Sequence, residues 1–148
     1  MNSSAILNAL IAKLGADATL LGYMPNGVYE DNAPEGQGMT KFVIVSHVIT
    51  NDVDVFGGRA YEDALFLVEA RATVKSGGNV AAAAAEIDAL LDPRPGASPS
   101  RATLDVAGYG LMAIKREEFV RNTERDEIDP TIVWKRRGGR YRVQMVIT

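Results

Sequence analysis

The residues that could support acid–base or metal chemistry lie in the middle of the chain. His47 is the only histidine, and the carboxylates Asp52, Asp54 and Glu62 follow it. A small carboxylate-dependent enzyme would need these side chains to converge in one pocket. No EF-hand spacing surrounds the two aspartates. The chain has no cysteine, which excludes thiolate nucleophiles and cysteine-based zinc sites.

His47 is better explained as a structural residue. It stands two residues from Val45 and two from Ile49, so the three share one face of a strand. The pattern shows no second histidine or cysteine that could complete a metal site. We therefore expect a core or interface histidine, no catalytic set, no metal and no cofactor.

A glycine pair opens the stretch "FGGRAYEDALFLVEARATVK", residues 56–75, and could be read as a phosphate-binding loop. Such a loop needs a helix directly after it, whose N-terminus adds to the attraction for the anion. Here the residues after the pair alternate between apolar and polar from Ala64 to Lys75. This period of two indicates a half-buried strand, so the pair is a corner at which the strand begins.

The corner is the first candidate for an interface with another subunit. Gly57 and Gly58 can adopt backbone conformations closed to other residues, and we expect them to present Phe56, Arg59 and Tyr61 toward a neighbour. Aromatic and arginine side chains dominate buried contacts between proteins. An ordinary solvent-exposed turn is the alternative. Further interface candidates are the strand charges Glu69, Arg71 and Arg140.

Composition predicts one folded domain over residues 1–148. The 148 residues are 47% hydrophobic and 24% charged, close to the average for globular proteins. The apolar run "FVIVSHVI" is too short to cross a bilayer, and we expect no export signal at the N-terminus. A net charge of −3 gives no general attraction to nucleic acid.

Helices and strands follow from periodicity and from capping residues. Ser3 or Ser4 can begin a first helix that Gly15 ends, Asp17 can cap a short further turn, and Asn79 can cap an alanine-rich helix. The pattern predicts strands at 41–49 and 61–75, one or two across 102–121, and a long strand or hairpin from 131 to 148. Loops are expected at 22–40, 50–60, 93–101 and 122–130.

The last segment leaves two interpretations open. Gly138-Gly139 is either a bulge that bends one strand, which we favour, or the two-residue turn of a hairpin. The surrounding "KRRGGR" could touch a nucleic-acid backbone, but such charges also discourage aggregation at a strand edge. The pattern as a whole predicts helices and strands within one domain.

The order of the segments resembles the tail-terminator or tail-completion proteins of long-tailed bacteriophages. The resemblance rests on a first helix and short turn, "GVYEDNAPEG", an apolar strand, "FGGRAYEDALFLVEARAT", an alanine-rich helix and a C-terminal "GGRYRVQMVIT". The segments 93–100 and 122–129 depart from the family pattern.

The resemblance implies an α+β fold, in which two helices pack on a mainly antiparallel sheet of about four to five strands. It also implies a non-enzymatic virion protein in the tail-neck region, which passes through the host cytoplasm during assembly. It implies a homo-hexameric ring that caps the tail tube and joins it to the head-completion or connector protein. DNA would pass through the ring without sequence-specific binding, and no membrane would be involved. The alternatives are another neck or tail component, namely a head-completion or tube protein, and the carboxylate-dependent enzyme described above.

Overall fold

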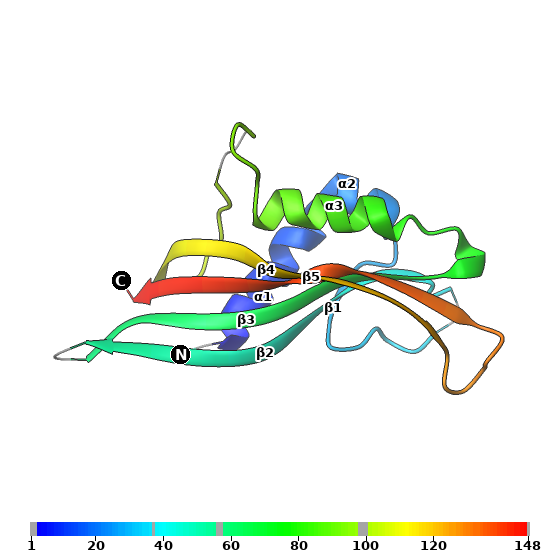
Figure 1. Ribbon diagram of the computed structural model, residues 1–148, viewed down its shortest axis with the longest axis horizontal. Coiled ribbons are helices and arrows are strands. Elements are labelled where there is room, and N and C mark those ends of the chain that lie inside the picture. Colours follow the sequence, from blue (N-terminus) through cyan, green and yellow to red (C-terminus); the bar gives the residue numbers. More distant parts are fainter. Residues whose placement is uncertain (1–2, 37, 56–57, 98–100, 148) are drawn as a thin grey trace.

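A computed structural model describes residues 3–36, 38–55, 58–97 and 101–147, without the side chains of residues 3, 52–55 and 58–60. Three α-helices lie against one long, twisted sheet (Figure 1). The elements are α1 (Ser3–Gly15), α2 (Ala18–Tyr23), β1 (Val28–Glu30), β2 (Lys41–Val55), β3 (Gly58–Thr73), the 3₁₀ turn η1 (Val74–Ser76), α3 (Val80–Leu91), β4 (Tyr109–Arg125) and β5 (Val133–Ile147).

The sheet has five strands in the order β1-β2-β3-β5-β4. Among the strands of the described residues, only the short β1 runs parallel to its neighbour; β2–β3, β3–β5 and β5–β4 are antiparallel. Two hairpins, β2–β3 and β4–β5, therefore make most of the sheet. The predicted α+β class and the mainly antiparallel sheet are confirmed.

Two of the helices, α2 and α3, begin where the capping residues predict. Asp17 accepts a hydrogen bond from the backbone N–H of Leu20 at 3.0 Å at the start of α2. Asn79 does the same for Ala82 at 3.0 Å at the start of α3. Within the described ranges, none of the helices is long and apolar enough to cross a membrane.

Both hairpins are longer than the sequence predicts. The segment 50–60, predicted as a loop, is strand through Val55 and again from Gly58. The predicted connector 122–130 is strand as far as Arg125. Asn and Asp disfavour strands locally, but here each has a cross-strand partner, such as Asn51 opposite Asp63. Pairing with the neighbouring strand overrides local propensity.

The C-terminal segment is one strand, and Gly138-Gly139 is neither a turn nor a bulge in it. β5 pairs with β3 without a register shift from Trp134 to Met145. The two bulges of this hairpin lie in β4, between Leu111 and Ala113 and between Arg116 and Glu118. The favoured bulge is therefore wrong, and the uninterrupted β3–β5 register is the reason.

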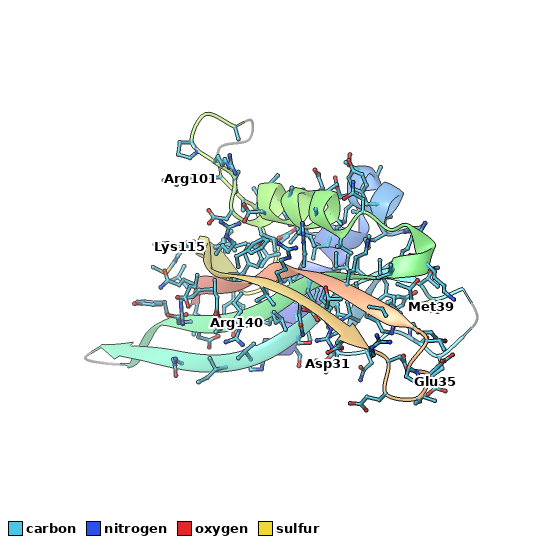
Figure 2. All side chains as sticks on the ribbon, turned by 45° about the vertical axis from the view of Figure 1, so that its right-hand side comes forward. Asp31, Glu35, Met39, Arg101, Lys115 and Arg140 are labelled. Atoms are coloured by element: carbon cyan, nitrogen blue, oxygen red, sulfur yellow. The ribbon has the colours of Figure 1, made fainter. Side chains whose placement is uncertain are left out.

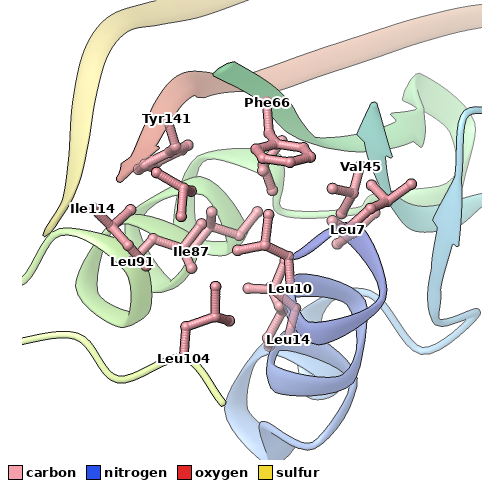
Figure 3. Close-up of a cluster of buried hydrophobic side chains, with 14 of the residues drawn as sticks. Leu7, Leu10, Leu14, Val45, Phe66, Ile87, Leu91, Leu104, Ile114 and Tyr141 are labelled. Carbon is pink, nitrogen blue, oxygen red and sulfur yellow. The ribbon is translucent and has the colours of Figure 1, made fainter. Parts of the chain in front are cut away.

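The core lies between the three helices and one face of the sheet (Figure 3). Alternate residues of β3 from Ala64 to Ala72 face this core, with Phe66 at its centre. Leu10 of α1 and Ile87 of α3 pack from the helical side. The prediction of a core or interface histidine is wrong as to the core, because His47 is exposed, and its place in an interface stays a prediction. Its ring lies 5.4 Å from that of Phe66.

Candidate interaction surfaces

The sheet face opposite the helices, here called the outer face, carries cross-strand ion pairs rather than helices. Alternation along β3 places Asp63 and Glu69 on this face, while β5 contributes Arg136, Arg140 and Arg142. Each of these arginines finds an acid on β3 or β4. The outer face is thus a charged surface whose charges are largely matched within the chain.

Glu69 is the most buried of these acids, at 1% exposure. Its Oε1 accepts a hydrogen bond from Arg71 Nε at 2.7 Å and lies 3.8 Å from Arg136 Nη1. Arg136 also pairs with Glu124 of β4. A buried carboxylate needs such partners, because an uncompensated charge in the protein interior is costly.

A second group of charges centres on Arg142. Its guanidinium contacts Asp63 Oδ1 at 2.7 Å and Glu117 Oε2 at 3.1 Å, which joins β5 to both of its neighbours. The Arg142 hydrogen bond holds the pKa of Glu117 below its ordinary value. Arg140 and Glu118 are only loosely paired at 3.5 Å, and both are exposed.

A groove of about 760 Å³ opens at one end of the outer face. Its floor includes Phe42 and Trp134, whose rings meet edge to face with centroids 5.5 Å apart. One wall is the 32–36 loop and the other is the end of the β4–β5 hairpin. Figure 2 shows Glu35 and Met39 at this end of the molecule.

The turn between β4 and β5 is held by two aspartates. Asp126 Oδ1 accepts the backbone N–H groups of Ile128 and Asp129 at 2.9 and 3.1 Å, and its Oδ2 accepts the Trp134 indole N–H at 3.1 Å. Asp129 Oδ1 in turn accepts the backbone N–H and the hydroxyl of Thr131 at 3.0 and 2.6 Å. We call residues 126–129 the acidic tip; Ile128 within it is 95% exposed.

A smaller hollow of about 170 Å³ lies on the helical side of the same hairpin. We call it the basic hollow. Its walls combine the start of α3 with basic side chains of β4 and β5: Gly78, Asn79, Val80, Ala81, Arg121, Asn122, Thr123, Lys135, Arg136 and Arg137. Lys135 Nζ donates to the carbonyl oxygen of Gly78 at 3.2 Å and so ties β5 to the residues that precede α3.

The structure places the predicted interface residues unevenly. Phe56 and Gly57 lie outside the described residues, as does the side chain of Arg59. Tyr61 is half-buried in β3, opposite Val53 of β2. The predicted corner therefore stays a prediction.

The three strand charges differ in what they can offer a partner. Glu69 and Arg71 are bound to one another within the sheet, whereas Arg140 is exposed and only loosely paired. Of these three, Arg140 has the geometry of a residue that a partner can reach.

The possible enzyme residues do not form a described pocket. His47 Nε2 lies 2.5 Å from Thr50 Oγ1, on an exposed part of β2. Glu62 is fully buried, and its backbone is paired with Asp52 and Met145. The side chains of Asp52 and Asp54 are not described. Among the described residues, no group of three or more histidines and acids is placed to hold a metal ion.

Sequence reasoning missed the acidic tip and the basic hollow. The sequence did show the charges "NTERDEID" and "KRRGGR". The turn that Asp126 organises rests on local hydrogen bonds, which the sequence analysis did not consider. The sequence could not show that α3 lies beside β4 and β5, because this depends on contacts between distant segments.

Comparison with known proteins finds solved structures with a similar fold. No protein-family model and no curated protein sequence matches this chain. A solved chain from the virion of a native gene transfer agent particle is similar in structure, with a TM-score of 0.63, 22% sequence identity and 96% of each chain covered. A second solved structure covers 100% of this chain and 96% of its own, with a TM-score of 0.53 and 14% identity. The chain therefore shares its fold, over nearly its whole length, with a component of a gene transfer agent virion.

Proposed function

We propose that this chain is a non-enzymatic structural protein of a phage-like virion, at the head-proximal end of the tail tube. In this role six copies form a ring that terminates the tail and joins it to the head. The observation that carries the proposal is the fold shared with a gene transfer agent virion chain over 96% of both chains. The order of segments in the sequence, which resembles tail terminators, supports the finer assignment.

The proposed partners are other copies of the chain, the tail tube protein and the head-completion or connector protein. The protein would reside in the tail-neck region of the virion after assembly in the host cytoplasm. DNA would pass through the ring without sequence-specific contacts. The net charge of −3 supports this last point, because a negatively charged ring does not retain a polyanion.

The sheet offers surfaces suited to such assembly. The open groove beside Trp134 and the exposed, loosely paired Arg140 provide an aromatic and an arginine of the kinds that dominate protein interfaces. The free edge of β4 and the acidic tip extend the surface available to neighbours. By themselves, these features do not separate a ring subunit from a tube protein or a head-completion protein. The sequence resemblance is what favours the ring subunit.

The test is particle assembly without this protein. Particles that lack it should accumulate separate heads and tails, and added purified protein should restore their joining, as seen by electron microscopy. Labelled protein should lie at one end of the tube. Label along the whole tube would identify a tube protein, and label on heads alone would identify a head-completion protein; either result contradicts the proposal.

The predicted corner and Arg140 can be tested in the same assay. Arg59→Ala and Arg140→Ala should reduce the joining of heads to tails while the isolated protein keeps its thermal stability. Arg94→Ala, a change to an exposed arginine elsewhere, is the matched control. Normal joining by both variants would remove these two residues from the proposed interface.

A further inference from the structure

We propose that the acidic tip of one copy docks into the basic hollow of a second copy of this chain. The contact rests on self-association, which is part of the proposed function, and names the two surfaces that would make it.

The acidic tip is built as a rigid projection. The carboxylates of Asp126 and Asp129 accept four hydrogen bonds within the turn, three from backbone N–H groups and one from the hydroxyl of Thr131. Arg125 Nη1 adds a bond to the carbonyl oxygen of Pro130 at 3.0 Å. The turn presents Ile128, 95% exposed, between the acids Glu127 and Asp129. A preorganised loop loses little conformational entropy when it binds.

The basic hollow has the opposite charge, which the described residues neutralise only in part. Across the described ranges, neither Arg121 nor Arg137 has an acidic partner, whereas Arg116, Arg136 and Arg142 all do. The N-terminus of α3 opens into the same hollow and adds partial positive charge.

The walls of the hollow also suit an apolar side chain. The exposed methyl group of Ala81 lies in this wall beside the basic residues, whereas the side chain of Val80 is buried in the core. An isoleucine flanked by acids is therefore matched in both respects: the methyl group of Ala81 receives Ile128, and the arginines receive Glu127 and Asp129. Charge complementarity of this kind favours correct encounter and fixes the register of the contact.

The tip cannot reach the hollow of its own copy. β4 and β5 remain paired as far as Arg125 opposite Val133, so the hairpin would have to break for its end to fold back. The contact must therefore be intermolecular. It joins two different surfaces, and such a head-to-tail contact generates a closed ring or a filament rather than a two-fold dimer.

The absence of native cysteine allows a direct cross-linking test. We would prepare Ile128→Cys and Ala81→Cys as separate proteins, mix them and oxidise. A disulfide between the two variants can form only between copies. The matched control replaces Ala81→Cys by Ala89→Cys, an exposed alanine about 12 Å further along α3. We expect a mixed dimer with the first pair and little with the control.

A charge exchange tests the same contact without covalent trapping. Glu127→Arg and Arg137→Glu should each weaken self-association at low salt by about tenfold or more, and the mixture of both should recover it. Arg121→Glu serves as a second variant of the hollow, because Arg121 is exposed and its replacement leaves the fold intact. Glu30→Arg and Arg94→Glu are controls on exposed positions elsewhere. Native mass measurement and sedimentation report the association.

The outcomes separate this contact from the proposed function. A selective disulfide together with recovery in the mixture supports the contact. If all the charge variants assemble equally well and no selective disulfide forms, the proposed contact is wrong, although a ring built on other contacts is still allowed. If the protein does not self-associate even on isolated tails, the proposed contact is also wrong. The head–tail joining assay then tests the proposed function independently.

Discussion

The indole N–H of Trp134 donates a hydrogen bond to Asp126 Oδ2 at 3.1 Å, across the turn that joins β4 to β5. Asp126 uses its other oxygen for two backbone N–H groups of the same turn. One carboxylate thus connects the acidic tip to the floor of the groove. The hydrogen bond from Trp134, followed by those from the backbone of Asp129 and Ile128, lowers the pKa of Asp126 below its ordinary value.

The first prediction concerns this turn in acid. Because the folded-state pKa of Asp126 lies below its ordinary value of 3.8, its stabilising bonds are intact above that pH and are lost as the pH falls through the lowered pKa. Trp134 is the only tryptophan, so its fluorescence reports on the turn. We expect its emission to change in strong acid while the far-ultraviolet circular dichroism is still native.

Two variants establish the cause of that change. Asp126→Asn should remove the acid transition of the Trp134 emission, because the amide does not titrate in this range. Glu127→Gln, a neutralised neighbour in the same tip, should retain it. An unchanged transition in Asp126→Asn would show that another group controls the environment of Trp134.

The second prediction concerns the buried carboxylate of Glu69. Glu69→Gln should lower the free energy of unfolding by about 1–3 kcal/mol, because it leaves Arg71 and Arg136 without their shared anion; the partly exposed arginines keep the loss below that of a fully buried pair. Urea denaturation measures the change. Glu118→Gln, which alters an exposed pair with Arg140, should stay within about 0.5 kcal/mol of the unaltered protein. Equal effects of the two changes would contradict this account.

The third prediction concerns Gly138, where β5 approaches β3 closely. A Cβ atom there would lie 1.9 Å from the carbonyl oxygen of Val68 and 2.6 Å from Glu69 Cα, so both strands would have to move. Gly138→Ala should cost about 2 kcal/mol or more in unfolding free energy. Gly22→Ala is the control: no atom lies within 4 Å of its Cβ position, and alanine favours the helix. Thermal or urea denaturation of both variants measures these changes in unfolding free energy.

The fourth prediction concerns the link between the sheet and α3. The Tyr141 hydroxyl donates to Asp88 Oδ1 at 3.1 Å, and Arg116 Nη1 pairs with the same oxygen at 3.2 Å. Burial, then the negative charge of Asp88, raises the pKa of Tyr141. Tyr141→Phe should lower the unfolding free energy by only about 0.5–1.5 kcal/mol, because Arg116 still satisfies Asp88. Tyr109→Phe, at a half-buried tyrosine of β4, is the control and should be nearly neutral.

Local signals in the sequence determined the element types and several boundaries. Asp17 and Asn79 predicted helix starts because a capping side chain acts on the backbone only two or three residues away. The alternation after Ala64 predicted β3 and its core-facing side, since a strand turns successive side chains to opposite faces. These features depend on neighbours in the chain, and the residues that cause them can be read directly.

Only the tertiary structure decided the length of the hairpins, the role of Gly138 and the surfaces proposed for assembly. Asn51 and Asp52 belong to β2 because β3 lies opposite them, and Gly138 is required because Val68 approaches it from another strand. The basic hollow likewise exists because α3 packs beside β4 and β5, which brings Ala81 next to Arg137. Each of these depends on contacts between segments far apart in sequence, and local propensity carries no information about which segments will meet.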